Sequence, residues 1–234
     1  MLKGKIYKTK ELNGHDLDEM FGLMFEYYDN INRENFLSDF EKKDDVVILR
    51  DEEDNVIKGF STILFYDLNV KNEIVKILFS GDTIIHKNYW AHNNLANVWL
   101  QYAIKKQKEF NTCLYWLLIS KGYKTYKYLN TFFKEYYPNP NKQTPEFEQQ
   151  IIDKFGTTFH KNEYDPKRGI LYMNKKKDYL KREYASIPEN QLKDRTVKFF
   201  IEKNPEYYEG NELICVTNLS EGNINNAGKR LLGI

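Results

Sequence analysis

The sequence predicts a mixed α/β fold, in which a central sheet is flanked by helices and followed by a C-terminal extension. Three observations carry this prediction. β-rich runs over residues 45–85 indicate an antiparallel meander. The nearly continuous apolar run NTCLYWLLIS, residues 111–120, is typical of a strand buried on both faces. Amphipathic helical patterns precede and follow that run, which predicts a right-handed strand–helix–strand crossover.

The first elements are a strand, two helices and the meander. Alternating apolar and polar residues around Ile6 predict the opening strand. Apolar residues at helical spacing over 15–31 predict a helix with Asp16 as its N-cap, and those over 33–43 predict a second helix. Within 45–85, an acidic turn, DEEDN, and a turn rich in Asn separate the β-rich runs.

The second half of the core follows from residues 79–106, FSGDTIIHKNYWAHNNLANVWLQYAIKK. This stretch starts as a strand, breaks at a polar turn and continues as an amphipathic helix. A helical stripe over 123–136 ends before Pro138. Because Pro and Asn cluster after it, we place a boundary at residue 140, between a core of residues 1–140 and an extension of residues 141–234. The pieces of the extension are short, and we expect them to extend the sheet or cover its edge.

Composition excludes several classes of function. Lys and Arg total 35 against 34 acidic residues, so no overall field attracts nucleic acid, and a nucleic-acid partner is not expected. The sequence shows neither a signal peptide pattern nor an apolar run long enough to span a membrane. Cys113 and Cys215 lie in apolar runs, as buried reduced thiols do. Together these features predict a cytoplasmic protein. The four His residues are dispersed, and we expect no metal site.

The turn after the strand that ends near Ile85 is a candidate anion site. The first amides of a helix lack internal partners, and the helix dipole adds positive potential. Asn93 and Asn94 either shape this turn for a ligand or simply cap the helix, and capping is the more frequent role of such residues. Lys87 and His92 could contact a phosphate directly.

Two further positions carry candidate chemistry. Ser80, Gly81 and Asp82 interrupt a β run, which is typical of a β-bulge, although a plain kink at a sheet edge explains the pattern equally well. Asp82 is the best-placed carboxylate to orient an amine or to act as a base, directly or through water. Ser120 and Lys121 lie at the carboxyl end of the buried strand, where α/β sheets place ligands. Ser120 is therefore a candidate ligand contact or a helix N-cap.

This order of elements resembles the GNAT acyltransferase superfamily over roughly residues 3–138. In that family, a loop connects the fourth strand to the helix after it. This loop has a six-residue pattern: Gln or Arg, any two residues, Gly, any residue, and finally Gly or Ala. The matching segment here is WAHNNL, or the same frame one residue later, and it contains neither glycine. The segment KGYKTYKYLNTFFKEYYP resembles the last core helix of the family.

The resemblance implies an acyltransferase that moves an acyl group from acetyl-CoA or another acyl-CoA to an amine or hydroxyl by direct attack, without a metal. It implies that Gly81 or Asp82 faces the thioester, and that Tyr128, or its neighbour Tyr126, protonates the departing thiolate. The phosphates of the donor would be held by the loop and the start of the helix. The residues implied there are His92, Asn93, Asn94, Leu95 and Ala96.

Two other functions stay open at this point. The absent loop glycines favour a GNAT-like binding or interaction module without catalysis. Alternatively, the donor is carried by an acyl carrier protein, which would bind the basic residues of 175–182, although a solvated helix face is the more frequent role of such a run. The sequence identifies neither the acceptor nor the acyl chain.

Overall fold

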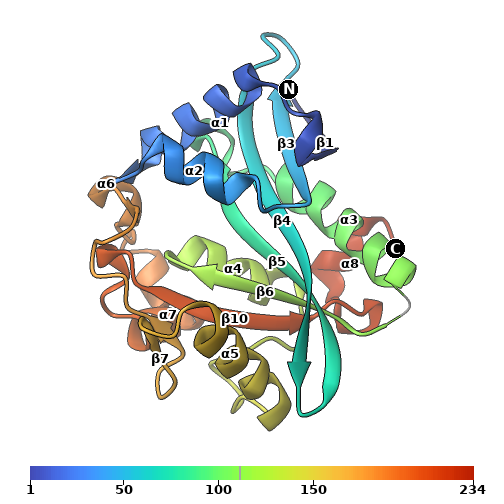
Figure 1. The fold of residues 1–234 in the computed structure, drawn as a ribbon, viewed down its shortest axis with the longest axis vertical. Coiled ribbons are helices and arrows are strands. Elements are labelled where there is room, and N and C mark those ends of the chain that lie inside the picture. The colour runs from blue at the N-terminus through green and yellow to red at the C-terminus, as the bar shows by residue number, and fades with distance from the viewer. Residues whose placement is uncertain (111) are drawn as a thin grey trace.

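The computed structural model describes residues 1–110 and 112–234, and an eight-stranded mixed sheet forms its centre (Figure 1). A two-stranded sheet, β2 (Tyr28–Asp29) with β9 (Tyr179–Leu180), lies apart from it. The strands of the main sheet, in spatial order, are β1 (Leu2–Lys8), β3 (Asp45–Asp51), β4 (Ile57–Val70), β5 (Glu73–Ile85), β6 (Leu114–Ser120), β10 (Glu212–Asn218), β8 (Ile170–Leu171) and β7 (Tyr164–Asp165).

β5 and β6 pair in parallel, and α3 connects them. The other neighbouring strands of the main sheet pair antiparallel. The structure thus confirms the predicted order: an opening strand, two helices, an antiparallel meander and a strand–helix–strand crossover. It also confirms the mixed α/β fold class.

The helices flank the sheet on both faces. They are α1 (Gly14–Tyr27), α2 (Arg33–Phe40), α3 (Asn94–Phe110), α4 (Tyr123–Phe132), α5 (Glu146–Phe159), α6 (Arg182–Ala185), α7 (Arg195–Lys203) and α8 (Asn226–Leu232). Single 3₁₀ turns occur at Thr9–Glu11, Lys87–Tyr89, Gln191–Lys193, Tyr207–Glu209 and Glu221–Asn223.

Local signals explain the start of α1. The side chain of Asn13 accepts a hydrogen bond from the Asp16 amide, and the Asp16 carboxylate accepts one from the Asn13 amide. This is a capping box, in which two amides of the first turn find partners. The prediction that Asp16 is the N-cap was therefore wrong by three residues, because the acceptor nearest the helix start is Asn13.

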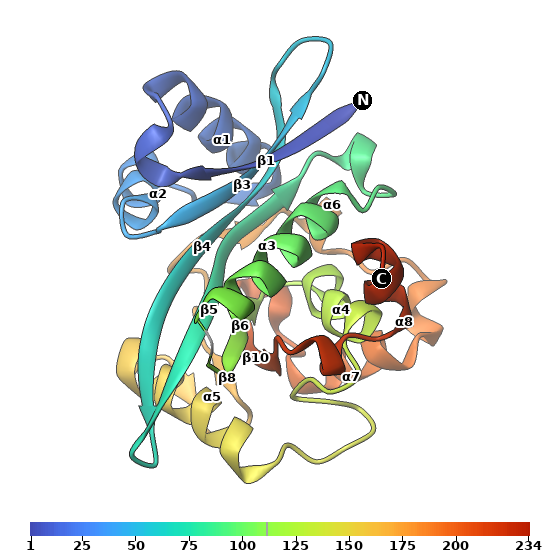
Figure 2. The ribbon, with the colours of Figure 1, turned by 90° about the vertical axis from the view of Figure 1, so that its right-hand side faces the viewer.

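The core consists of two layers on opposite faces of the sheet. One face packs against α3, α4 and α7, while α1 and α2 cover one half of the other face and α5 covers its other half (Figures 1 and 2). Successive strand residues alternate between the layers, as Ile77 and Leu78 do. Between α2 and α5, no helix of the described chain covers the middle of β5 and β6 in Figure 1.

Residues after 140 contribute β7, β8 and β10 to the same sheet. β10 pairs with β6 from Leu213 opposite Ser120 to Asn218 opposite Tyr115, and five of its residues in a row are fully buried. The boundary at residue 140 stays a prediction. In the described part of the chain, no helix is long and apolar enough to cross a membrane.

Candidate functional site

The sheet opens at the carboxyl ends of its two parallel strands. The β5–β6 ladder ends where Ser80 pairs with Leu118. Beyond this point β5 follows β4 as far as Ile85, whereas β6 follows β10 as far as Ser120. The two strands therefore diverge and leave a V-shaped opening through the sheet.

A bulge in β5 begins the divergence. Ile63 of β4 pairs with Ser80, but Ser61 pairs with Thr83, so three steps on β5 face two steps on β4. The extra residue lies at Gly81 and Asp82, which confirms the predicted bulge. A Cβ on Gly81 would lie 2.5 Å from Thr62 Oγ1 and 2.8 Å from Lys43 Cε. β5 can therefore lie this close to the two side chains because residue 81 has no side chain of its own.

A pocket fills the opening on the face covered by α3 and α4, and we call it the α3/α4 pocket. It encloses about 560 Å³ of unfilled space, counting its open mouth, and its walls are mainly apolar. Four of the residues implied by the resemblance line it, namely Gly81, Leu95, Ala96 and Tyr128. Its other lining residues are Ser61, Ser80, Thr83, Trp99, Leu100, Trp116, Leu118, Ile119, Thr125, Phe132 and Phe133.

The first turn of α3 lies at this pocket. Leu95 and Ala96 are buried in its wall, and amides at this position in a helix have no acceptor within the helix. Asn93 is exposed, and its carbonyl accepts the first helical hydrogen bond. The side chain of Asn94 donates to the carbonyl of Leu2, 3.0 Å away, so it ties the helix to β1 instead of facing the pocket.

The loop before α3 contacts the start of α4. Lys124 Nζ lies 3.1 Å from the centre of the Trp90 ring, so this contact joins the segments that follow β5 and β6. Desolvation lowers the pKa of Lys124 to about 8, and no carboxylate pairs with it among the described residues. Lys87 and His92 are exposed, and Lys87 lies 3.9 Å from Glu26.

Asp82 lies on the other side of the opening. Burial, together with the charge of Asp178, raises its pKa to about 6, while Lys121 acts in the opposite direction. The more distant charges of Asp39 and Lys43 also act on it. These groups come from the segment around α2 and from the segments after β6 and before β9, so the carboxylate belongs to the face that α1 and α2 cover.

A charged cluster surrounds Asp82. Lys121 Nζ forms an ion pair with Asp178 and lies 3.5 Å from Glu212 Oε1 and 5.6 Å from the centre of the Tyr28 ring. Burial alone would lower the pKa of Lys121, but the carboxylates of Glu212 and Asp178 outweigh it and raise that pKa. The amine that the sequence placed near a ligand is thus already paired.

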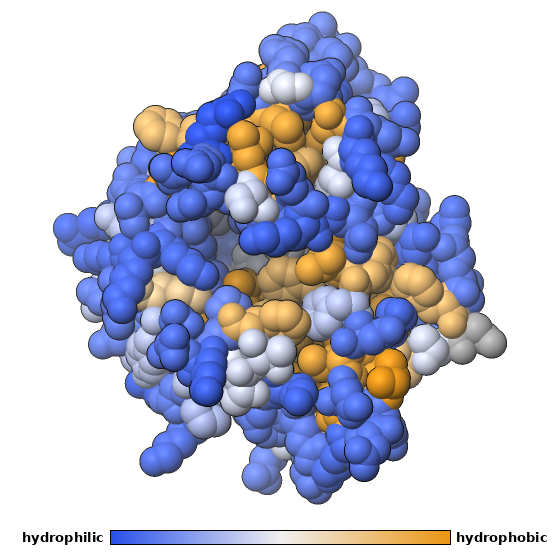
Figure 3. Space-filling view, viewed as in Figure 1, coloured by the Kyte–Doolittle hydropathy of each residue, from blue (hydrophilic) through white to orange (hydrophobic). Residues whose placement is uncertain are grey.

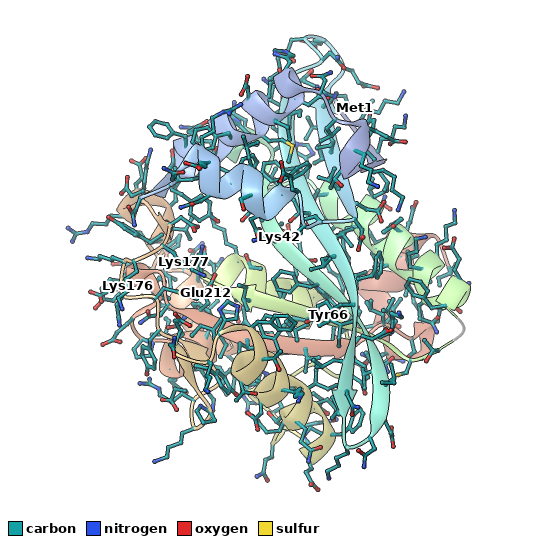
Figure 4. The ribbon with its side chains drawn as sticks, viewed as in Figure 1. Met1, Lys42, Tyr66, Lys176, Lys177 and Glu212 are labelled. Carbon is teal, nitrogen blue, oxygen red and sulfur yellow. The ribbon has the colours of Figure 1, made fainter. Side chains whose placement is uncertain are left out.

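The molecular surface is hollowed below α2 in this view, and we call this hollow the carboxylate cleft (Figure 3). Lys177 and Glu212 lie on one side of it, and Lys42, two residues after α2, lies above it (Figure 4). Glu212 is buried, and burial raises the pKa of its carboxyl. Gly81 thus lines the α3/α4 pocket, while its neighbour Asp82 lies among the charged groups of the other face, so the two sites flank the bulge.

The remaining predicted residues divide into two groups. Tyr128 is half-buried in the pocket wall, and burial raises its pKa, so its hydroxyl stays protonated at neutral pH. Tyr126 is fully buried and donates to the carbonyl of Pro138 over 2.8 Å, which removes it from the pocket. Ser120 is buried and donates to the carbonyl of Gly122, which is itself the N-cap of α4, so Ser120 is not the helix N-cap.

Sequence reasoning missed Trp99, Lys124, Asp178 and Glu212 as site residues. Trp99 was assigned only to a helix face, and nothing in the sequence brings residues 178 and 212 next to residue 82. Across the residues that the structure describes, no group of three His, Cys, Asp or Glu side chains could hold a metal ion.

The diverging parallel strands, the bulge and the element order match the sheet that the resemblance to the GNAT superfamily implies. The chain has a GNAT-like fold. One solved structure to which it is similar is N-acetylglutamate synthase from Neisseria gonorrhoeae, complexed with coenzyme A and N-acetyl-glutamate. The two are 11% identical, with a TM-score of 0.43, and the match covers 94% of this chain and 36% of the other. A GNAT family N-acetyltransferase from Escherichia coli in complex with CoA is 13% identical, with a TM-score of 0.39, over 56% of this chain and 69% of the other.

A probable N-acyltransferase from Enterococcus faecalis V583 is 11% identical, with a TM-score of 0.42, over 58% of this chain and 33% of the other. The chain therefore spans about a third of the length of the Enterococcus and Neisseria proteins. No protein-family model and no curated protein matches its sequence.

Proposed function

We propose that this GNAT-like protein transfers an acyl group from an acyl-CoA to an amine or hydroxyl acceptor by direct attack. One observation carries the proposal: at the bulge, Gly81 lines a mainly apolar pocket on one face of the sheet, and the next residue, Asp82, places a carboxylate among charged groups on the other face. A donor and an acceptor that enter from opposite faces would meet at this point.

The residues around the α3/α4 pocket suit a thioester donor. Its apolar walls suit the thin arm that carries the thioester, and the amides of Leu95 and Ala96 suit a phosphate at the helix N-terminus. Lys124 would add a cation beside the loop that precedes the helix. The missing loop glycines restrict how close the loop backbone comes to the phosphate, so the helix amides and Lys124 would hold most of its charge.

The residues at the opening suit the proton transfers of the reaction. Asp82, with a pKa of about 6, is mostly ionised at neutral pH and would take the proton of the attacking amine or hydroxyl. A backbone amide at the bulge would stabilise the carbonyl oxygen as the new bond to the acyl carbon forms. Tyr128 would give its proton to the sulfur as the carbon–sulfur bond breaks.

The test is a transfer assay with acetyl-CoA and a panel of primary amines and alcohols, read out as thiol release and as acylated product by mass spectrometry. Wild type should release thiol only when an acceptor is present. Asp82→Asn should lower kcat/KM by about 100-fold or more. The matched control is Asp67→Asn, since Asp67 pairs with Lys76 toward the far end of β5 and should not affect the rate.

Three outcomes would contradict the proposal in different ways. Saturable donor binding without turnover at any pH would favour a binding module. Transfer only from an acyl carrier protein, weakened by salt and by neutralising Lys175, Lys176 and Lys177, would favour a protein-bound donor. Equal rates for wild type and Asp82→Asn would remove Asp82 from the mechanism.

A further inference from the structure

Two adjacent tryptophans form part of the wall of the α3/α4 pocket. Trp99 comes from the second turn of α3 and Trp116 from β6, and their ring centres lie 4.3 Å apart. Each is 7% exposed. Both rings therefore pack alike against the core and the pocket, and they differ in what their indole N–H groups contact.

The N–H of Trp116 has a partner, whereas that of Trp99 has none. Trp116 Nε1 donates to Ser80 Oγ over 3.0 Å. Trp99 Nε1 is buried and has no hydrogen-bond partner in the part of the chain that the structure describes. Buried donors in folded proteins almost always have an acceptor, so an indole N–H without one in a pocket wall points to an acceptor supplied from outside the chain.

The hydroxyls that β4 and β5 contribute to the wall are already engaged. Ser61 Oγ and Thr83 Oγ1 lie 2.8 Å apart and share a hydrogen bond, and Ser80 accepts from Trp116. The side chains that surround Trp99 in this wall are largely apolar, such as Leu95. An occupant of the pocket must therefore be apolar over most of its length and carry an oxygen acceptor where it passes Trp99.

We propose that Trp99 is a ligand-binding residue whose indole N–H donates a hydrogen bond to a carbonyl oxygen of the acyl-CoA arm, at its thioester or at one of its amides, in the α3/α4 pocket. The inference rests on the proposed function and adds a polar contact to an otherwise apolar site. An acyl-CoA carries carbonyl oxygens in two places along its arm, at the thioester and at the two amides of the pantetheine unit. Any one of these three oxygens could accept the hydrogen bond of the Trp99 N–H.

Two substitutions separate binding from structure. Trp99→Phe and Trp116→Phe remove the same atoms from adjacent rings, but only Trp116→Phe breaks a hydrogen bond of the free protein. We expect Trp116→Phe to lower Tm by several degrees. Trp99→Phe loses the same packing but no hydrogen bond of the free protein, so it should lower Tm by clearly less than Trp116→Phe does, and it should weaken ligand binding by about three- to tenfold.

Calorimetric titrations with three probes identify the oxygen. The probes are acetyl-CoA, S-ethyl-coenzyme A, which lacks the thioester carbonyl, and coenzyme A itself. Trp99→Phe weakening acetyl-CoA alone would assign the thioester oxygen. Equal weakening of all three would assign a pantetheine amide, and both results support the inference.

Other results overturn it. If Trp99→Phe binds every probe within twofold of wild type, Trp99 does not bind the ligand, although the proposed function stands. If Trp99→Phe lowers Tm as much as Trp116→Phe does, its role is structural. If wild type binds none of the probes, the proposed function falls, and this inference falls with it.

Discussion

At the scale of single residues, Asp82 links the chemistry of the site to pH. Its pKa of about 6 results first from burial and then from the charge of Asp178. A general base works only when ionised, so kcat/KM should fall about tenfold per pH unit below pH 6 and level off above it. Thiol release measured between pH 5 and 8 checks this, and an unchanged profile down to pH 5 would contradict it.

Because its pKa is raised, the ionised Asp82 carboxylate lowers the free energy of unfolding. The native carboxyl binds its proton more tightly than the unfolded one, whose pKa is 3.8, so the native state holds the extra proton between about pH 4 and 6. Through this window the contribution of Asp82 to the free energy of unfolding falls as pH rises. Asp82→Asn should therefore be more stable than wild type by about 1–2 kcal/mol at pH 8, after allowing for partial exposure, and not at pH 4.

Urea unfolding at the two pH values measures this difference. Wild type as stable as Asp82→Asn at pH 8 would show that the carboxylate is ionised in the fold without penalty. The Asp67→Asn protein serves again as the control, because its carboxylate lies in an exposed pair with Lys76.

The candidate-site residues that sequence reasoning could predict are those whose signal is local. Gly81 and Asp82 interrupt a β run, and Tyr128 follows from a helix pattern, so both could be read from neighbouring residues. Tyr126 was also a candidate, because helix periodicity alone does not show that its hydroxyl donates to the carbonyl of Pro138. Sequence reasoning could not identify Glu212, because its contact with Lys121 depends on how β10 enters the sheet.

At the scale of elements, the bulge in β5 determines whether the sheet opens. A methyl group on Gly81 would overlap Thr62 Oγ1 and Lys43 Cε, and the neighbours would have to shift to accept it. Gly81→Ala should lower the free energy of unfolding by about 1–3 kcal/mol and abolish donor binding, because the strand would have to move at the opening.

Gly22→Ala provides the matched control for this substitution. Gly22 lies inside α1, and nothing lies within 4 Å of an added Cβ. The change should raise stability by about 0.5–1 kcal/mol and leave donor binding unaffected. Donor binding by Gly81→Ala that equals wild type in calorimetry would show that the bulge does not shape the pocket.

Helices and strands with strong periodicity could be predicted from the sequence, whereas the strands that pair with one another in the sheet could not. The apolar run of β6 and the amphipathic pattern of α3 specify the crossover from their own residues. The neighbour of β6 on its other side is β10, almost a hundred residues later, and nothing in either strand specifies this pairing. The carboxylate cleft depends on that long-range pairing, so the sequence alone did not reveal it.

At the scale of the whole molecule, the residues after 140 complete the sheet. β10 covers the edge of β6 and buries Leu213, Ile214 and Cys215. A chain that ends at residue 140 would expose this apolar edge and should aggregate. Size-exclusion chromatography of residues 1–140 checks this, and a monomeric, cooperatively unfolding fragment would show that the first 140 residues fold on their own.

Hydrogen exchange with and without acetyl-CoA tests the central claim most directly, because it shows both whether the donor binds and where. The account predicts slower exchange in the first turns of α3, residues 94–100, and at the diverging ends of β5 and β6. Residues of α5 on the opposite face should not change. Protection confined to the basic residues 175–182, or no protection at a saturating donor concentration, would contradict a donor site between β5 and β6.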